Sequence, residues 1–417
     1  MRSTRREFVV QTAGALSVAA ILPTLARAHW TSAAGPLTVG LVGAGRQGRQ
    51  ILAELAKMEM VKVVGVCDVD ASRREGAAKR TAGAEAFASH TEGRGKGRDM
   101  AAVIIASPTH LHTLIAIDCV KAGKHVYCEA PLAHTAEDCK QIAAAVAAAA
   151  GTEKKVFAVG FEGRSNPIYK LARTFFRSDA VRDFVEGEAQ CFKKESWRFP
   201  APAGADAART KAENWRLDAD VSLGLAGEWG AQQFDVMHWY TGKWPTSIFG
   251  TGSVRANDDG RTVADTAACN FGFEDGSRFA WNGSLANSYG GKFEVLRGTN
   301  AAVKLAWTHG WMFKEADAPT QGWEVYANRQ QFFNDEGITL IADATKLAAQ
   351  GALKDGVGLP NKSLWYALED FVKAALEGKM PGCDVVSGAR SSIVAILANQ
   401  AVVKGEVVKV EAGVLKV

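Results

Sequence analysis

The sequence outside residues 1–28 has almost no net charge. Those first 28 residues contain four arginines and one glutamate, which leaves 45 Lys and Arg against 44 Asp and Glu in the rest of the chain. A nearly neutral body gives no electrostatic basis for binding nucleic acid or an anionic membrane surface, so we expect neither as a partner. The 417 residues, 47% of them hydrophobic, are enough for two globular domains.

The sequence also lacks the cysteine spacing of a disulfide framework or a zinc site. It has seven cysteines, an odd number, with no C-x-x-C pair and no His/Cys spacing typical of metal ligands. Several of them stand in apolar strand or helix patterns, where a cysteine is usually a small buried hydrophobic residue. We therefore expect no disulfide framework and no metal site, even for a protein in an oxidising compartment.

An apolar run at the N-terminus is too short and too interrupted to form a membrane span. Arg5 and Arg6 stand in a polar segment, Pro23 breaks the run that follows, and Ala26-Arg27-Ala28 has the A-x-A form of a cleavage site. This pattern predicts a twin-arginine signal peptide over residues 1–28, cleaved after Ala28. It also predicts a periplasmic or otherwise exported protein, with no membrane span after signal cleavage.

Short apolar runs alternate with helical patterns in the first part of the chain. Such runs are typical of strands buried on both faces, and the alternation predicts a doubly wound parallel sheet, an α/β Rossmann domain over residues 36–155. The predicted strands are 37–42, Val61–Cys67, Ala102–Ala106 and His125–Cys128, with one more strand at Val156–Phe161; the predicted helices are Arg46–Met58, Ser72–Thr81, Leu111–Ala122 and Thr135–Ala150.

The pattern changes after about residue 160, where longer strands alternate apolar and polar residues. We expect residues 156–417 to form an α+β domain for substrate binding and oligomerisation, with an open, mainly antiparallel sheet. Glu274-Asp-Gly276 is a hairpin signal, and a long loop over 308–335 that includes Trp311 and Trp323 is expected to border the substrate cleft or a subunit contact. The predicted strands are Val181–Phe192, Ser247–Val254, Ala267–Phe273, Ser277–Leu285, Lys292–Arg297 and Ala302–Trp307; the predicted helices are Leu364–Glu377 and Gly388–Ala401.

A G-x-G-x-x-G motif stands between the first predicted strand and the first predicted helix. Gly43 permits a tight turn, Gly45 lets the backbone approach a pyrophosphate, and Gly48 allows close packing of helix on strand. The helix N-terminus supplies amide donors for the phosphates. Asp68, 20 positions beyond Gly48, would bind the adenosine ribose and repel a 2′-phosphate, which favours NAD over NADP, although arginines follow at positions 73 and 74.

Four further stretches together resemble the Gfo/Idh/MocA oxidoreductases. They are Val103–His112 (VIIASPTHLH), Ala122–Pro131 (AGKHVYCEAP), Gly160–Pro167 (GFEGRSNP) and Asn214–Arg216 (NWR), and the resemblance covers nearly the whole chain after residue 28. It implies a tightly bound NAD, hydride transfer at a carbon of a carbohydrate substrate, and a homo-oligomer, either a dimer or a tetramer.

The resemblance also implies which residues hold the cofactor. One group lines the nicotinamide side, Glu129 ends the strand beneath the nicotinamide, and Trp215 and Arg216 come from the second domain and close over the cofactor. The implied cofactor-binding residues are Gly43, Gly45, Arg46, Gln47, Gly48, Asp68, Ser107, Pro108, Thr109, His112, Glu129, Ala130, Trp215 and Arg216.

The proton-transfer residues usual for this family are all replaced. The family has a lysine in an E-K-P motif and an Asp/His pair four residues apart on one helix face; the matching positions here are Ala130, Glu228 and Gln232. Of these three, only Glu228 can act as a general acid or base. We take Glu228, Gln232 and Tyr169 as catalytic candidates, and His238 as a packing residue.

Three functions stay open on the sequence. The chain is an oxidoreductase that moves a hydride on a sugar, a redox-neutral NAD-dependent glycoside hydrolase or lyase of the same fold, or a catalytically silent protein that binds NAD or sugar. The tryptophan-rich second domain is in keeping with a carbohydrate ligand, because apolar sugar faces stack on aromatic rings. The substrate-binding candidates are Glu162, Arg164, Lys194, Gln233 and Tyr289.

Overall fold

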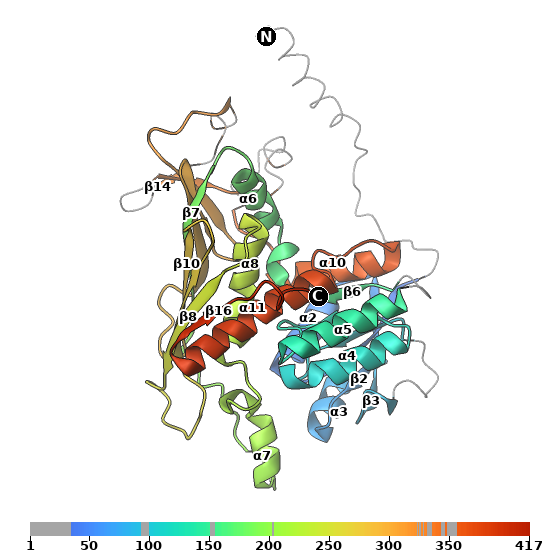
Figure 1. The fold of residues 1–417 in the computed structure, drawn as a ribbon. Helices are drawn as coiled ribbons and strands as arrows, with labels where there is room; N and C mark the ends of the chain where they lie inside the picture. The colour runs from blue at the N-terminus through green and yellow to red at the C-terminus, as the bar shows by residue number, and fades with distance from the viewer. Residues whose placement is uncertain are drawn as a thin grey trace. The chain divides into compact units, whose positions relative to one another are not determined.

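The structure is a computed structural model that describes residues 35–92, 100–150, 155–201, 204–322, 324, 327, 329–331, 336–342, 347 and 357–417. The predicted signal peptide over residues 1–28 and Trp323 lie outside the described residues. Residues Leu37–Val417 hold two β-sheets and the helices that pack on them (Figure 1).

The first sheet is the predicted doubly wound parallel sheet. Its six strands lie in the order β3-β2-β1-β4-β5-β6, and every pair is parallel. The strands are β1 Leu37–Val42, β2 Val61–Cys67, β3 Glu85–Phe87, β4 Ala102–Ile105, β5 His125–Cys128 and β6 Phe157–Val159; the helices are α2 Arg46–Leu55, α3 Ala71–Arg80, α4 His112–Lys121 and α5 Ala136–Ala149. The sequence analysis missed β3, which is only three residues long.

Strand β4 shows why continuous apolar runs predicted this sheet. Ala102 and Ile104 point to one core, with α2 and α3, while Val103 and Ile105 point to the other, with α4 and α5. All four residues are buried. A strand covered by helices on both faces has no polar face, so its sequence shows no alternation.

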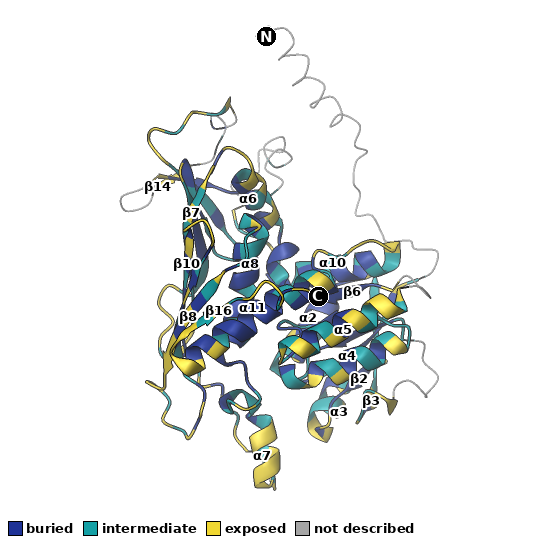
Figure 2. Ribbon diagram, in the orientation of Figure 1, coloured by how far each residue is buried: buried dark blue, intermediate teal, exposed yellow. Residues whose placement is uncertain are grey.

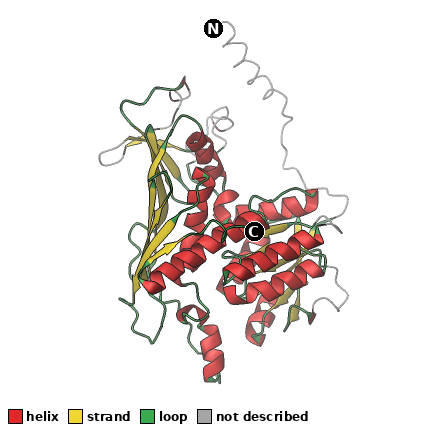
Figure 3. Ribbon diagram, in the orientation of Figure 1, coloured by secondary structure: helices red, strands yellow, loops and turns green. Residues whose placement is uncertain are grey.

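The second sheet is open and mainly antiparallel, as predicted. Its ten strands lie in the order β14-β15-β13-β12-β11-β7-β10-β9-β8-β16, and β7 and β10 are its parallel pair. Helices α6, α8 and α11 line one face (Figure 3). The strands are β7 Phe184–Phe192, β8 Ser247–Ser253, β9 Thr266–Gly272, β10 Arg278–Ser284, β11 Lys292–Gly298, β12 Ala301–Leu305, β13 Gly310–Lys314, β14 Arg329–Gln331, β15 Glu336–Thr339 and β16 Val407–Lys409; the helices are α6 Pro167–Arg177, α7 Ala207–Glu213, α8 Ala231–Thr241, α10 Ser363–Glu377 and α11 Val385–Lys404.

The predicted boundary at residue 155 does not match the packing of the two domains. β6 follows it and is an edge strand of the first sheet. Helix α10, nearly the whole chain length away from β1, also belongs to the core of the first domain, where Phe371 is fully buried and contacts Tyr127. The first domain is therefore built from two separate parts of the sequence.

The long loop predicted over 308–335 is wrong, because β13 and β14 lie within it. The predicted hairpin is confirmed: β9 and β10 are antiparallel neighbours, and Gly276 has the positive φ of +81° that the turn between them needs. The seven cysteines all lie in the described residues; none of them forms a disulfide there, and all are buried. Helix α11 is long and apolar enough to cross a membrane, but it lies mostly buried between α5 and the second sheet (Figure 2).

Candidate functional site

The candidate site lies where the strand order of the first sheet reverses. β1 pairs with β2 on one side and β4 on the other, so the connections after β1 and β4 leave in opposite directions. In open α/β sheets this divergence leaves a crevice beyond the carboxyl ends of the strands, where ligands bind. The glycine motif follows β1 and Ser107 follows β4, so both lie at that edge.

The three glycines of the motif have three different steric reasons. Gly43 has a φ of +96°, and a Cβ there would lie 2.6 Å from the carbonyl of Ala106. A Cβ at Gly48 would lie 1.8 Å from the carbonyl oxygen of Gly43. A Cβ at Gly45 would meet no atom within 4 Å. Gly43 and Gly48 are thus required by the fold itself, whereas Gly45 faces open space of the kind a pyrophosphate occupies in this motif.

Asp68 lies at the end of β2 beside this loop, as the sequence predicted. Its carboxylate accepts hydrogen bonds from the backbone amides of Ala44 (2.8 Å) and Asp70 (2.9 Å). Each carboxylate oxygen keeps a further lone pair for a ribose hydroxyl. Arg74 donates to the backbone carbonyls of residues 68 and 69, and the charge of Arg73 is paired with Glu213.

In the segment after β4, the side chain of Ser107 lacks a hydrogen-bond partner among the described residues, whereas those of Thr109 and His112 lie against polar groups. The Oγ of Ser107 is buried and has no partner among the described residues, which suits a contact with a bound cofactor. Pro108 precedes the 3₁₀ turn Thr109–Leu111, and the hydroxyl of Thr109 donates to Glu228. His112 is 1% exposed and its ring nitrogens lie 2.9 Å from the carbonyl of Ser107 and 3.1 Å from that of Pro131. Its contact with the cofactor stays a prediction.

Glu129 and Glu162 form an acidic pair at the ends of β5 and β6. Burial, and then the charge of Glu162, raise the pKa of Glu129 to about 8, while Gln47 donates to its Oε1 at 3.3 Å. Burial also raises the pKa of Glu162. Ala130, in the family's lysine position, supplies no cation to offset these charges. A carboxyl with a pKa near neutrality can both give and take a proton, which is what acid–base chemistry requires.

Glu228 approaches the same edge from the second domain. It lies in a π-helical turn, Ala226–Gly230, just before α8, and its side chain is 4% exposed. The hydroxyl of Thr109 donates to both of its oxygens, at 3.1 and 3.2 Å, and the Nε of Arg216 lies 3.9 Å away. Burial raises the pKa of Glu228 and the charge of Arg216 lowers it. Trp215, next to Arg216, contacts His110 edge to face. The second domain therefore touches the first domain both at Thr109 and at His110.

Gln232 has a structural role that its sequence position did not reveal. Its Nε2 donates to the carbonyl of Gly160 at 2.7 Å, and its Oε1 accepts from the backbone amide of Glu162 at 3.0 Å. Both ends of the side-chain amide are therefore used to hold the turn after β6. Gln232 therefore positions Glu162, and its catalytic role stays a prediction.

Three other predicted residues are committed to the interior. Tyr169 is fully buried and donates to Glu294 at 2.5 Å, and its catalytic role stays a prediction. Gln233 is also fully buried, and bonds the sheet and Trp281. Arg164 is buried and holds Asp235 through two nitrogens. Gln233 and Arg164 were predicted to bind substrate. The side-chain amide of Gln233 is used at both ends in these bonds, and a substrate contact of Arg164 stays a prediction.

Lys194 and Tyr289 remain predictions. The backbone amide of Lys194 donates to the hydroxyl of Ser288 at 2.7 Å, so the two predicted residues lie close together. Both are exposed, and the Tyr289 side chain is almost entirely so. Nothing in their surroundings directs either side chain at the strand-end carboxyls.

A segment that we call the strap, Glu195–Phe199 together with α7, joins the second domain to the nucleotide edge of the first. Glu195 pairs with Arg46, and the Phe199 ring lies 5.0 Å from the Arg46 guanidinium carbon. Within α7, Arg209 pairs with Asp70 and Glu213 pairs with Arg73. Apart from these contacts α7 is exposed (Figure 2).

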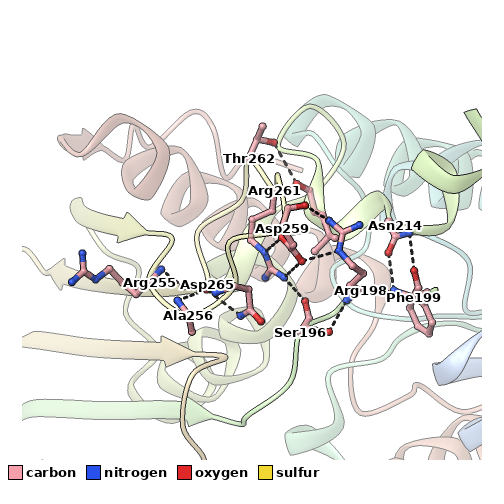
Figure 4. A network of polar contacts seen from close by, with 12 residues as sticks. Ser196, Arg198, Phe199, Asn214, Arg255, Ala256, Asp259, Arg261, Thr262 and Asp265 are labelled. Atoms are coloured by element: carbon pink, nitrogen blue, oxygen red, sulfur yellow. Dashed lines mark hydrogen bonds and ion pairs between the residues drawn. The ribbon is translucent and has the colours of Figure 1, made fainter. Parts of the chain in front are cut away.

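The base of the strap is fixed to the second domain by a polar network (Figure 4). The amide of Asn214 bonds both backbone groups of Phe199, and Asp259 accepts from Arg198 and Arg261. Those two arginines hold the pKa of Asp259 well below its ordinary range. The strap is thus anchored at one end and held to the first domain by ion pairs at the other.

Comparison with known proteins assigns both domains. The description "Oxidoreductase family, NAD-binding Rossmann fold" matches residues 37–161, and "GFO/IDH/MocA C-terminal domain" matches residues 193–304. The chain belongs to the Gfo/Idh/MocA family. Its first domain is an NAD-binding domain, and the open face of Gly45, Asp68 and the unpartnered Ser107 hydroxyl fit that cofactor.

Individual relatives of this Gfo/Idh/MocA protein are distant. Inositol 2-dehydrogenase from Rubrobacter xylanophilus is 26% identical over 298 residues, which are 69% of this chain and 77% of the relative. An uncharacterised oxidoreductase, YrbE from Bacillus subtilis (strain 168), is 25% identical over 61% of this chain and 69% of its own. A levoglucosan dehydrogenase in complex with NADH and L-sorbose superposes with a TM-score of 0.70 at 19% identity, covering 90% of this chain and 99% of that one, which shows the fold.

Two kinds of contact could not be read from the sequence: those of the strap, which has no motif, and the bond that Gln47 makes to Glu129 from within the glycine motif. The strap residues Arg209 and Glu213 lie in a short polar helix, and Gln47 gave no sign that it would reach Glu129. His110 lies within the SPTHLH stretch, and its place in that motif was the one signal for it in the sequence. None of the other contacts has a local pattern, because each joins residues far apart in the sequence.

The glycine motif gives the first prediction. Gly45→Ala is expected to fold as the wild type but to bind NAD about tenfold more weakly or worse, because its methyl group enters the space that a pyrophosphate approaches. Gly48→Ala is expected to lose ~1–3 kcal/mol of unfolding free energy, because its methyl group overlaps the Gly43 carbonyl. Thermal denaturation and calorimetric titration with NAD measure the two effects. Equal NAD affinity of Gly45→Ala and wild type would contradict the assignment.

The strap gives the second prediction. Glu213→Lys places two cations together against α3, so NAD should leave the protein several-fold faster, and the effect should shrink at high salt because exposed charges are screened. The rate at which bound NAD leaves is measured by displacing it in a rapid-mixing experiment. Glu188→Lys is the matched control, since it reverses the partner of Arg297 on the second sheet. If both variants release NAD at the wild-type rate, the strap does not retain the cofactor.

Proposed function

We propose that this protein is an NAD-dependent dehydrogenase of a carbohydrate or cyclic polyol, in which strand-end carboxyl groups carry the proton in place of the family's lysine. One observation carries the proposal: Glu129, Glu162 and Glu228 gather at the cofactor edge, and the pKa of each is raised by burial. Inositol and levoglucosan dehydrogenases among the similar proteins give the substrate class.

Each group of the chain has a defined part in this proposal. The glycine loop, Asp68 and Ser107 bind and orient the dinucleotide, which when bound exchanges a hydride with the substrate carbon. Glu129 takes the hydroxyl proton when its carboxyl is ionised and returns it in the reverse direction. Gln47 orients Glu129 by its hydrogen bond. Glu228, fixed by Thr109 and Arg216, binds other substrate hydroxyls from the opposite wall.

A redox-neutral glycoside hydrolase or lyase is the second candidate. The replacement of the family's lysine by Ala130 favours it. The strap favours it too, because a reaction that regenerates its NAD benefits when the NAD stays bound between turnovers. The same carboxyl groups would protonate the leaving oxygen of a glycoside. The two candidates differ in whether NADH accumulates.

The assay that tests the proposal uses purified holoenzyme. Denaturation should release NAD, and incubation with myo-inositol or levoglucosan plus added NAD should produce NADH. Aryl glycosides without added NAD provide the second arm. Net NADH from a polyol or sugar supports the dehydrogenase; release of the aryl group without NADH supports the glycosidase. A protein that binds no NAD, or that binds it and does neither reaction, would leave only the silent binding protein.

Glu129 gives a pH-dependent prediction. Its native pKa of about 8 lies above its ordinary 4.5, so between these two pH values the native protein holds a proton that the unfolded chain releases. The free energy of unfolding therefore falls as pH rises through this window. Glu129→Gln, a mimic of the protonated form, should equal wild type at low pH and be more stable than wild type above pH ~8.

The same variant should lose oxidation rate by about 100-fold, because an amide cannot accept the hydroxyl proton. Urea denaturation at two pH values and steady-state kinetics measure both effects. The control is Glu188→Gln, which removes a carboxyl from the surface of the second sheet. A Glu129→Gln protein with full activity would show that another residue carries the proton.

A further inference from the structure

Lys292 begins β11 on the face of the second sheet that α6 and α8 cover. Side chains alternate along a strand, so Lys292 shares this inner face with Glu294, while Phe293 points outward. Glu294 is fully buried and accepts the Tyr169 hydrogen bond. The first turn of α8 reaches the strand here, because Gln233 donates to the carbonyl of Phe293 at 2.9 Å.

The ammonium of Lys292 has an aromatic partner and two acidic neighbours. Its Nζ lies 3.5 Å from the centre of the Trp307 ring. Its positive charge lowers the pKa of Glu162 and of Glu294, in both cases against the opposing effect of burial. Within the described part of the chain, no carboxylate forms an ion pair or hydrogen bond with Nζ. Because the ammonium lies over the Trp307 ring, at most two of its three N–H donors can turn to a ligand.

This ammonium faces the strand-end site from the second domain. Glu162 lies in the turn after β6, and Gln232 of α8 holds that turn by two hydrogen bonds. The neighbouring Gln233 holds β11 beside Lys292. Gln232 of α8 therefore bonds the turn that carries Glu162, and the next residue, Gln233, bonds the strand that carries Lys292. Glu162 therefore has a cation from the sheet near it, although Ala130 supplies none.

We propose that Lys292 is a catalytic residue whose ammonium contacts the substrate hydroxyl that reacts, in place of the lysine absent at position 130. This inference rests on the proposed dehydrogenase function. The step is a proton transfer: the substrate O–H bond breaks, the proton forms a new O–H bond with the Glu129 or Glu162 carboxylate, and the electron pair stays on the substrate oxygen. The ammonium stabilises the negative charge that develops on that oxygen, while the Trp307 ring and the strand fix its position.

The test compares Lys292→Met with Lys304→Met in the NAD-loaded holoenzyme. Lys304 is a matched control, because it also lies over an aromatic ring but on the outer face of the same sheet. Its Nζ is 4.8 Å from the centre of the ring of Phe293, which points to that face. Lys292→Met should keep wild-type NAD affinity but bind myo-inositol and levoglucosan about tenfold more weakly and turn over about 100-fold more slowly. Lys292→Arg, which keeps the charge, should recover part of the loss. Calorimetric titration, thermal denaturation and steady-state kinetics supply the measurements.

The pH profile separates a catalytic from a structural role. The titratable groups that face Lys292 are Glu162, from the turn after β6, and Glu294 and Cys191, from the sheet; Lys193 and Glu195 flank Cys191. Loss of the ammonium removes a charge that lowers the pKa of Glu162. The alkaline rise of the oxidation rate should therefore move to higher pH in Lys292→Met, a shift that a packing defect does not produce.

The outcomes distinguish this inference from the function on which it rests. If the wild type oxidises a sugar or polyol and Lys292→Met does so at the rate of Lys304→Met, the inference is wrong and the proposed function stands. If Lys292→Met does not fold, the same readouts on Lys292→Arg and on Lys292→Gln decide: a wild-type rate in the uncharged variant overturns the inference. If the wild type holds NAD but neither binds nor oxidises these substrates, the proposed function and the inference both fail.

Discussion

The approach of helix α2 to the end of β1 is the contact on which the rest of the site depends. The Gly43 carbonyl and the Gly48 Cα come so close that no side chain fits between them. This contact brings the N-terminus of α2 to the strand edge, where its amides and dipole favour a phosphate. It also sets where Gln47 projects, and Gln47 is the residue that orients Glu129. The cofactor loop and the acidic pair are thereby placed by the same packing constraint.

The electrostatics of the site differ from those expected of a family member. A lysine between the strand-end glutamate and the proline would neutralise nearby carboxylates and keep their pKa values low. With Ala130 there, burial is the largest influence on both carboxyls: it raises the pKa of Glu162, and together with the charge of Glu162 it raises the pKa of Glu129 to about 8. Because a dissociable proton is then already present at the strand edge, the loss of the lysine changes which group can carry the proton and does not remove the capacity.

Contacts between the two domains do most of the positioning. Thr109 of the first domain holds Glu228 of the second, Gln232 of the second domain holds the turn that carries Glu162, and the strap pairs with α3. Several residues that sequence reasoning placed in direct contact with ligands turn out to make such bonds instead. Gln232 is an example: its side-chain amide bonds the backbone of the turn that carries Glu162. A polar residue near a motif is therefore as often part of the frame as part of the chemistry.

The sequence by itself determined the parallel sheet, the glycine loop and Asp68, because short-range patterns encode them: apolar runs, a fixed glycine spacing and a strand followed by a helix. The replacement of the family's lysine followed from the resemblance to the family. Only the tertiary structure decided that α10 completes the first domain, that Tyr169 and Gln233 are interior, and that Lys292 faces Glu162. Burial and charge pairing depend on which surfaces meet after the chain has folded. Residues 130 positions apart, such as Glu162 and Lys292, leave no local pattern that records their meeting.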